Sequence, residues 1–362
     1  MHLNTLKYIN HFISSKIARF TYKTQGPLFL NMALTYRCNS KCQMCNIWKT
    51  YKKNSQKATQ ELRIQDYERF FNDNKKYLKD LLQIAITGGE PFLREDLVEL
   101  VKIIHKLYPR AFIDLSTNGF LSKRITSTVE KFFKENPILR LQVSVSLDGI
   151  GEVHDEIRGV KGAFEKVRTT CELLRELKDR FSNLEITLSF TILESNYKEI
   201  SKVYQFAERY GVRFTLRPAQ VSEIYYLNPN LKVSFPNDMI QFVEMKAKEI
   251  SLGYRSFFIR HIKNYLRNPK KQIVPCYSLF YSMFTDPFGD VYPCTFINSS
   301  VGNIKDAEFF ERIWNSNKIK SMRKEIKNNR CPNCWTECES NKSIYLDGTS
   351  LLFWYIFERH LR

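Results

Sequence analysis

Three closely spaced cysteines are the residues of this sequence best suited to chemistry. Cys38, Cys42 and Cys45 lie in the segment Cys-Asn-Ser-Lys-Cys-Gln-Met-Cys, directly after an apolar run that predicts a strand at 28–34. Thiolates are the protein ligands of iron–sulfur clusters, and a loop lets three of them reach one cluster. Zinc is the alternative, but a closed structural zinc site takes four ligands, and the next cysteine is Cys171. Three thiolates on a four-iron cluster leave one iron open to a further ligand.

A second group of cysteines follows near the end of the sequence. Its members are Cys276, Cys294, Cys331, Cys334 and Cys338. Four thiolates from separated segments would close a cluster with no open iron, which leaves one cysteine over. The sequence does not distinguish Cys331 from Cys338 as the fourth ligand. Four cysteines also suit zinc, and only the partnership with the first group favours iron.

The elements that must position these cysteines alternate along the chain. Apolar runs predict strands at 28–34, 83–87, 111–116, 141–147, 185–192 and 213–216, and periodic apolar positions predict helices near 64–78, 95–107, 123–135, 162–178 and 198–209. Strands that alternate with helices form parallel sheets through right-handed crossovers. We therefore expect an α/β fold, a partial parallel (β/α)6 TIM-like barrel with its site at the C-terminal strand ends.

Polar motifs follow several of the predicted strands. Gly-Gly-Glu-Pro at 88–91 follows the second strand, where glycines let backbone approach a ligand and a carboxylate can accept hydrogen bonds from an ammonium group. Ser-Thr-Asn-Gly at 116–119 ends the third strand and alone would be an ordinary turn. Ser144, Ser146 and Asp148 alternate along the fourth strand, so they should face the barrel interior.

Together these motifs resemble the radical SAM superfamily. Its hallmark, Cys-x3-Cys-x-aromatic-Cys after the first barrel strand, matches the cysteine spacing here, with Met44 where an aromatic residue is commoner. The resemblance implies that the open iron of a catalytic [4Fe-4S] cluster is chelated by the amino and carboxylate groups of S-adenosylmethionine. It further implies cleavage of that cofactor to methionine and a deoxyadenosyl radical, which abstracts hydrogen from a substrate.

The resemblance also implies cofactor contacts in the motifs after the second, third and fourth strands. The residues concerned are Gly88, Gly89, Glu90, Pro91, Thr117, Asn118, Ser146 and Arg158. The first four would hold the amino group of the cofactor's methionine part. The others would lie near the cofactor's ribose or its carboxylate. His154 is a further candidate, and Arg217 either lines the substrate side or ends the barrel in a salt-bridged turn. Cys171 has helical spacing with apolar neighbours and is expected to be a buried, small hydrophobe.

The second cysteine group resembles the C-terminal auxiliary-cluster domain called SPASM, or its shortened form, twitch. A full SPASM domain carries seven cysteines and two clusters, so the five cysteines here imply one auxiliary [4Fe-4S] cluster. Such a cluster would transfer electrons or position the substrate, and the net reaction would then be an oxidation. We divide the chain into five parts: an N-terminal amphipathic helix (1–27), the radical SAM core barrel (28–218), a connecting helical region without chemical signal (219–275), the auxiliary-cluster domain (276–345) and a C-terminal tail expected to pack on the body (346–362).

Composition limits the remaining possibilities. The formal charge is +18, from 56 Lys and Arg against 38 Asp and Glu, and the basic residues are spread along the chain with no nucleic-acid motif. We expect a solvated basic surface and no nucleic-acid partner. Because no apolar run spans a bilayer, no secretory signal is evident and the cysteines are clustered, we expect a cytoplasmic protein.

An amphipathic helix is predicted over 3–20, where apolar residues recur at helical spacing. They are Leu6, Ile9, Ile13, Ile17 and Phe20. We expect this face to pack on its own domain, with peripheral membrane contact as the alternative.

The substrate is not readable from the sequence: a peptide, a sugar, a lipid-linked or another small metabolite all remain open. The basic charge and the N-terminal helix favour an anionic glycan, nucleotide-sugar or lipid. Reduction of the catalytic cluster would need an electron donor such as flavodoxin or ferredoxin. The alternative from another class is a zinc-stabilised basic binding protein without catalysis.

Overall fold

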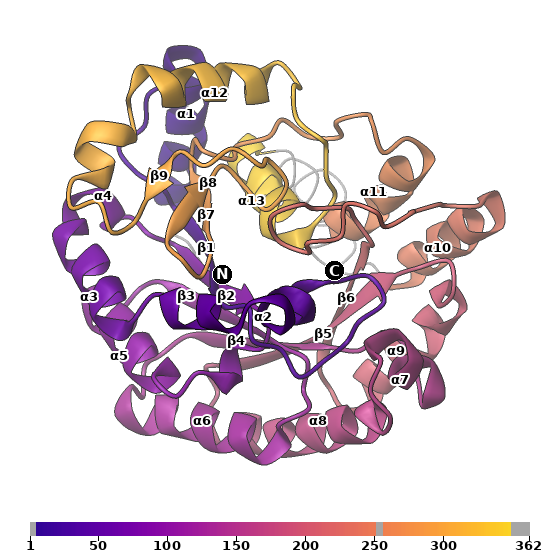
Figure 1. The fold of residues 1–362 in the computed structure, drawn as a ribbon. Helices are drawn as coiled ribbons and strands as arrows, with labels where there is room; N and C mark the ends of the chain where they lie inside the picture. Colours follow the sequence, from indigo (N-terminus) through magenta and orange to yellow (C-terminus); the bar gives the residue numbers. More distant parts are fainter. Residues whose placement is uncertain (1–4, 251–255, 349–362) are drawn as a thin grey trace.

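The computed structural model describes residues 5–250 and 256–348. Within them, nine strands form one sheet in the order β6-β5-β4-β3-β2-β1-β7-β8-β9 (Figure 1). The strands are β1 (Phe29–Thr35), β2 (Gln83–Gly88), β3 (Phe112–Thr117), β4 (Leu141–Ser146), β5 (Leu184–Ile192), β6 (Arg213–Pro218), β7 (Ser282–Thr285), β8 (Asp290–Tyr292) and β9 (Gly302–Asn303).

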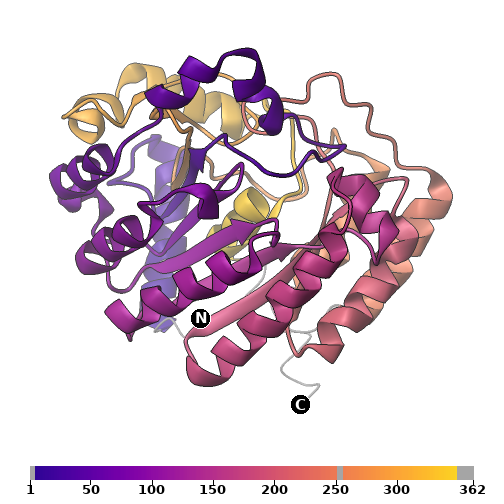
Figure 2. The same cartoon turned by 60° about the horizontal axis from the view of Figure 1, so that its bottom comes forward.

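The helices surround this sheet. They are α1 (Thr5–Thr21), α2 (Thr50–Lys53), α3 (Ile64–Asp73), α4 (Lys75–Leu78), α5 (Leu97–Leu107), α6 (Ser122–Glu135), α7 (Glu152–Arg158), α8 (Ala163–Arg180), α9 (Ile200–Arg209), α10 (Asn237–Ile250), α11 (Ser256–Arg267), α12 (Asn317–Lys327) and α13 (Glu337–Asp347). Figure 2 shows several of them side by side along the outer face of the sheet. None of the described helices is long and apolar enough to cross a membrane.

The first six strands are parallel, as their alternation with helices predicts. The α/β expectation is therefore confirmed. The sheet does not end at β1, however: β7 pairs with β1 in parallel and continues into the antiparallel strands β8 and β9. The cysteine-rich region thus adds its own strands to the edge of the barrel sheet.

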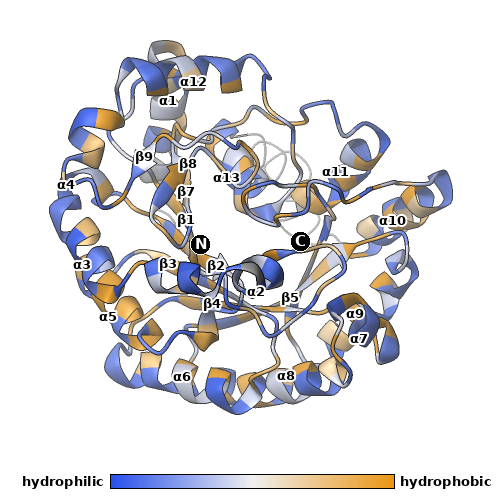
Figure 3. Ribbon diagram, viewed as in Figure 1, coloured by the Kyte–Doolittle hydropathy of each residue, from blue (hydrophilic) through white to orange (hydrophobic). Residues whose placement is uncertain are grey.

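The two faces of the barrel strands have different chemistry. On β4, Leu141, Val143 and Val145 are fully buried in the main apolar core, whereas Ser144 and Ser146 are half-buried on the opposite face. Successive residues of a strand point to opposite sides, so the apolar set packs on the helices and the polar set faces the barrel interior. Figure 3 shows the matching hydrophobic bands on the surrounding helices. The inward face of β4 is therefore polar, as predicted for the alternating serines, and we call the barrel interior that it faces the chamber.

Helix α13 lies inside the ring of helices and contacts α1 and α11 (Figure 1). Its buried Glu339 accepts hydrogen bonds from Asn31 Nδ2 of β1 (2.9 Å) and from Ser278 Oγ (2.8 Å). Lys342 Nζ, one turn later, donates to Asn31 Oδ1 (2.6 Å). These buried polar bonds fix the helix that carries Cys338 to β1, an interior strand of the sheet, a connection that the sequence did not reveal.

The face through which α1 packs differs from our expectation. Ile9, Ile13, Ile17 and Phe20 are exposed, and the side chain of Leu6 lies outside the described residues. The predicted packing of this apolar face was wrong, although the helix itself was predicted correctly.

The helix uses its opposite face instead. Ser15 and Ala18 are buried there, and Ser15 Oγ donates to the carbonyl of Leu346 at 2.9 Å. The Tyr8 and Tyr345 rings meet edge to face. Aromatic residues on α1 and α13 thus determined the packing, and the repeat of isoleucines did not. Of the C-terminal tail predicted at 346–362, Leu346 and Asp347 form the end of α13 and Leu346 is buried, whereas residues 349–362 lie outside the described residues.

Candidate active site

The loop that carries Cys38, Cys42 and Cys45 lies at the C-terminal end of β1 and is held by the end of α7. The carbonyl of Arg158 accepts from Lys41 N (2.9 Å) and from Ser40 Oγ (3.1 Å). The same Ser40 hydroxyl lies 3.0 Å from Cys42 Sγ. A helix end has unsatisfied carbonyls, and here they bind the cysteine loop.

A segment after β6 holds the other side of this loop. Asn46 N donates to the carbonyl of Tyr226 (2.8 Å), and Asn228 Nδ2 donates to the carbonyl of Met44 (2.7 Å). Tyr225 hydrogen-bonds Thr87 Oγ1 across the chamber. Residues 219–275, predicted as a connecting helical region without chemical signal, thus include a segment that supports the cysteine loop. The sequence signal for a structured turn in this segment is the Asn-Pro pair at 228–229, a combination that is common in turns.

The Gly-Gly-Glu-Pro segment lies against the cysteine loop. Gly89 N donates to the carbonyl of Thr35 (2.7 Å), and Glu90 N donates to that of Arg37 (2.8 Å). A Cβ added at Gly89 would lie 2.1 Å from the Arg37 carbonyl oxygen and 3.1 Å from Cβ of Cys38. The glycine is thus required for close approach to the cluster loop, whereas the motif in the sequence suggested close approach to a ligand.

Replacing this glycine should therefore dislodge the cluster loop. We expect Gly89→Ala to lose the iron of the first site and about 1–3 kcal/mol of unfolding free energy, because the added methyl overlaps backbone that must move. Iron analysis and urea denaturation of the anaerobic protein measure both. Gly211→Ala is the control for iron content: it precedes β6, an added Cβ there meets only Arg175 Nε at an ordinary 3.8 Å, and its φ of +60° makes the substitution cost stability without touching the cysteine loop. Equal iron content in the two variants would contradict the proposed contact.

Glu90 is a fully buried carboxylate next to this loop. It accepts hydrogen bonds from Thr117 Oγ1 (2.9 Å) and Asn118 N (2.7 Å). Burial nevertheless raises its pKa to about 7, since these hydrogen bonds and nearby Arg158 only partly offset desolvation. Asn118 also reaches the cysteine loop, donating from Nδ2 to Asn39 Oδ1 (2.6 Å). The third-strand motif therefore positions Glu90 and the loop together, and a carboxylate in this environment suits an amino group that donates to it.

This pKa predicts a pH-dependent affinity. Only the ionised carboxylate accepts all hydrogen bonds of an amino group, so S-adenosylmethionine should bind about tenfold more weakly at pH 6 than at pH 8. Without ligand, ionisation of Glu90 destabilises the folded chain as the pH rises from 4.5 toward 7, because its pKa is higher in the folded than in the unfolded state. Equilibrium binding at the two pH values tests this. Glu90→Gln should bind weakly at both, and a tenfold dependence retained in that variant would exclude Glu90 as its source.

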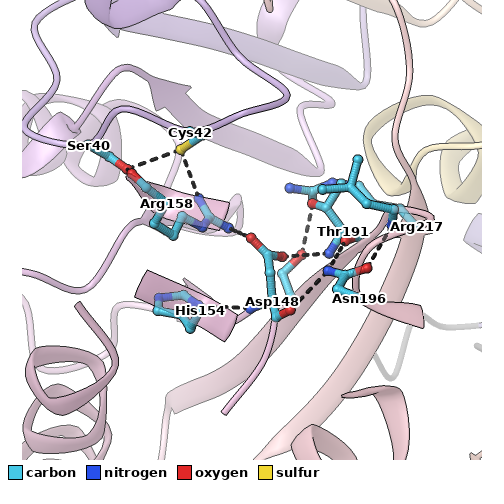
Figure 4. A network of polar contacts seen from close by, with 10 residues as sticks. Ser40, Cys42, Asp148, His154, Arg158, Thr191, Asn196 and Arg217 are labelled. Carbon is cyan, nitrogen blue, oxygen red and sulfur yellow. Dashed lines mark hydrogen bonds and ion pairs between the residues drawn. The ribbon is translucent and has the colours of Figure 1, made fainter. Parts of the chain in front are cut away.

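Arg158 and Asp148 form a buried ion pair beside the cysteines, shown in Figure 4. Arg158 Nη2 lies 2.5 Å from Asp148 Oδ2, with side-chain exposures of 9% and 0%. Arg158 Nη1 donates to Cys42 Sγ (3.6 Å). The other carboxylate oxygen of Asp148, Oδ1, accepts a hydrogen bond from the backbone N of Thr191 (2.7 Å). The Asp148 backbone carbonyl accepts one from Asn196 Nδ2 (2.9 Å).

The guanidinium still has a hydrogen-bond donor to offer. Among the described residues, buried Arg158 Nε has no hydrogen-bond partner. A carboxylate is the natural ligand for such a donor, so the site fits the carboxylate that the resemblance assigns to it. His154 is buried with Nδ1 accepting from Asp148 N (3.0 Å), and burial together with Arg158 holds its pKa well below the usual value. Neutral His154 thus supports the backbone of Asp148.

The chamber beyond these groups contains Arg217. Its Nη1 donates to Ser189 Oγ (2.8 Å) and pairs with Glu337 Oε2 of α13 (3.2 Å). A salt bridge of Arg217 is thus present, although it joins β6 to α13 and does not close a turn, and a position on the substrate side stays a prediction. Ser146 lies directly opposite Ser189 in the β4–β5 register, on the chamber side of the sheet.

The second cysteine group is gathered between β7, β8 and α13. The pKa of the buried Cys334 thiol is raised by desolvation and by neighbouring Cys294, Cys276 and Cys338. Cys331 lines a pocket with Cys276 and Cys334. All five predicted ligands therefore come from one region, and both Cys331 and Cys338 stay candidates for the fourth position.

Neither group has the geometry of a single-ion site. Among residues 5–250 and 256–348, no three His, Cys, Asp or Glu side chains converge on a point that could hold one metal ion. A zinc site needs such convergence, with Zn–S distances of about 2.3 Å. The described side chains therefore do not by themselves select zinc for either group.

A parallel barrel with a three-cysteine loop after its first strand, and a second cysteine group attached, defines a radical SAM enzyme with an auxiliary-cluster domain. The chain matches the radical SAM superfamily over residues 32–207 and an iron–sulfur cluster-binding domain, SPASM, over 276–339. It belongs to that superfamily. The first match implies a catalytic [4Fe-4S] cluster and S-adenosylmethionine, and the second implies auxiliary iron–sulfur binding.

Characterised proteins share this organisation. A cysteine-type anaerobic sulfatase-maturating enzyme of Clostridium novyi is 27% identical over 340 residues, covering 84% of this chain and 86% of that enzyme. An AdoMet-dependent heme synthase of Methanosarcina barkeri is 26% identical over 317 residues, covering 82% and 84%. The crystal structure of Streptococcus suis SuiB bound to S-adenosylmethionine has a TM-score of 0.61 at 17% identity, covering 88% of this chain and 72% of SuiB. The last similarity concerns the fold alone.

Proposed function

We propose that this enzyme binds a [4Fe-4S] cluster through Cys38, Cys42 and Cys45 and uses it with S-adenosylmethionine to abstract hydrogen from a substrate in the barrel chamber. The observation that carries the proposal is the pair of buried groups beside the three-cysteine loop. These are the carboxylate Glu90 and the guanidinium of Arg158, whose Nε–H has no hydrogen-bond partner among the described residues. Amino and carboxylate groups of one amino acid would meet complementary partners there.

The cluster, when bound, supplies the electron that splits S-adenosylmethionine into methionine and a deoxyadenosyl radical. The chain's own residues bind and orient. Glu90 accepts from the amino group, Arg158 donates to the carboxylate, and Thr117 with Asn118 keeps Glu90 in place. Ser144 and Ser146 line the chamber where the substrate would be held.

We further propose one auxiliary [4Fe-4S] cluster on Cys276, Cys294 and Cys334 with either Cys331 or Cys338. With four thiolates it has no open iron, so electron transfer with a substrate radical is the role that suits it, and the net reaction would be an oxidation. A small donor such as flavodoxin or ferredoxin would reduce the catalytic cluster.

We infer that the substrate carries a negative charge. The relatives named above act, by their names, on sulfatases and in heme synthesis, so their activities do not select one substrate class. Within the chamber, buried Arg217 Nε has no partner among the described residues, and only Glu337 pairs with its charge. An anionic group on a peptide, sugar or lipid-linked metabolite would satisfy it.

The experiment that tests this function uses protein purified and reconstituted without oxygen. Iron and sulfide are counted, then S-adenosylmethionine and a reductant are added and deoxyadenosine is measured. About eight irons per chain, with deoxyadenosine formed, is the expected result for two four-iron clusters. Bound zinc in place of iron, without deoxyadenosine, would overturn the proposal.

A further inference from the structure

Helix α1 has a second apolar face that nothing in the described structure covers. Ile9, Ile13, Ile17 and Phe20 are 43%, 50%, 56% and 82% exposed. Their spacing places them on one side of the helix, opposite the face that holds buried Ser15 and Ala18. Single exposed apolar residues are ordinary, but a continuous row along a helix indicates an interaction surface. We call these four residues the α1 stripe.

The surroundings of the α1 stripe are strongly basic. The segment from Thr5 to Lys23 contains no acidic residue. Of its cations, Lys23 is exposed, Lys16 pairs with Asp347, and Arg19 is turned to the carbonyl of Cys276. Helix α12 adds Lys318, Lys320, Lys324 and Lys327 against a single Glu325, whereas its Arg323 is fully buried. The two helices meet where Arg323 Nη1 donates to the carbonyl of Tyr22 (2.9 Å) and the Lys327 ammonium lies 5.1 Å from the Tyr22 ring centre. An apolar row with flanking cations has the chemistry of a helix that lies in the surface of an anionic membrane.

The chain that follows the described part leaves from the same place. Gly348 packs against α1 so closely that an added Cβ would lie 2.8 Å from the Phe12 ring. The sequence beyond it reads Leu-Leu-Phe-Trp-Tyr-Ile-Phe over 351–357, followed by Arg359 and Arg362. Trp and Tyr with nearby Arg are the residues preferred at membrane–water interfaces. The described chain therefore ends beside α1, and the sequence that follows it is a second apolar and basic segment. Stable peripheral binding generally needs two such signals.

We propose that α1 docks on the surface of a lipid bilayer that contains anionic lipids, with the α1 stripe in the headgroup region. The excess of cations around the stripe is the reason to choose this occupant over a second copy of the chain, whose own basic surface would repel it. Arg19, on the same helix, donates from Nη1 to the carbonyl of Cys276 (2.6 Å). Docking would thus bring the auxiliary-cluster end of the enzyme close to the membrane.

The test is co-sedimentation of the full chain with vesicles of phosphatidylcholine, with or without phosphatidylglycerol. The wild type should bind the phosphatidylglycerol vesicles, and binding should weaken with added NaCl. The triple variant Ile13→Ser, Ile17→Ser and Phe20→Ser should bind them roughly 100-fold more weakly, because three apolar side chains no longer leave water. These residues are exposed, so folding should be unaffected. Ile138→Ser is the matched control, since Ile138 is 68% exposed outside α1, and it should bind like the wild type.

Other occupants of the α1 stripe would give different results. Light scattering that shows a dimer, lost in the triple variant, would assign the stripe to a second copy and overturn the proposal. Equal binding of the wild type and the triple variant, or equal binding to vesicles without phosphatidylglycerol, would overturn it as well. Deoxyadenosine formation, measured on the same samples, reports separately on the proposed enzymatic function, because the α1 stripe does not line the chamber.

Discussion

Cys38→Ala is expected to abolish deoxyadenosine formation and to lower bound iron from about eight to about four per chain. Cys38 is one of three ligands on a single loop, and no other cysteine lies in that loop to replace it. Two thiolates cannot hold a four-iron cluster firmly, whereas the second cysteine group belongs to other segments and should keep its iron. The measurements are iron and sulfide content and product analysis under anaerobic conditions.

Cys171→Ala is the matched control for this variant. Cys171 is fully buried on α8, in the apolar core and away from both cysteine groups, where it behaves as a small hydrophobe. We expect full iron content and wild-type deoxyadenosine formation. Cleavage activity that persists in Cys38→Ala would mean that the first cysteine loop is not the catalytic site, and loss of all iron would mean that the two cysteine groups do not load independently.

Arg158→Leu is expected to cost about 3–5 kcal/mol of unfolding free energy, the largest stability effect that we predict. The substitution leaves Asp148 as a buried carboxylate without its counter-charge, since the Asp148 side chain is 0% exposed. It also removes the donor to Cys42 and the proposed partner of the cofactor carboxylate, so S-adenosylmethionine binding should fall sharply. Urea denaturation and equilibrium binding measure the two effects.

Two further variants test whether the loss of stability in Arg158→Leu comes from the broken charge pair. Arg158→Leu combined with Asp148→Asn should recover much of the stability, because the amide oxygen still accepts from Thr191 N while the unpaired charge is gone. Cofactor binding should not recover, since the guanidinium is still missing. Arg168→Leu removes an ion pair with Glu172 whose side chains are 43% and 40% exposed, and should leave stability unchanged. A stability loss in Arg168→Leu equal to that in Arg158→Leu would contradict the role of burial.

The strands and the first cysteine site could be predicted because their signals are local. Apolar runs separated by helical patterns predict β1 to β6, because the hydrophobic period of a strand or a helix is visible within a few residues of sequence. Cys38, Cys42 and Cys45 lie within one loop, so their spacing alone indicates a shared ligand. The Gly-Gly-Glu-Pro motif was found the same way, and only the structure shows that its Gly89 also packs against the cysteine loop.

The tertiary structure decided the pairings between distant segments. Cys42 meets Arg158, Glu339 meets Asn31, and Asn228 reaches Met44, because a closing barrel brings together residues that the sequence keeps far apart. The position of β7 beside β1 belongs to this group, since strand pairing depends on which sheet edge is open.

The orientation of α1 is the clearest case. The isoleucine spacing correctly predicted the helix from the sequence by itself, but two sides of α1 carry apolar residues. Only the position of Tyr345 and Leu346 on α13 determined which side is buried. A helical period identifies faces, whereas the choice between two apolar faces depends on the packing surface that the rest of the fold offers.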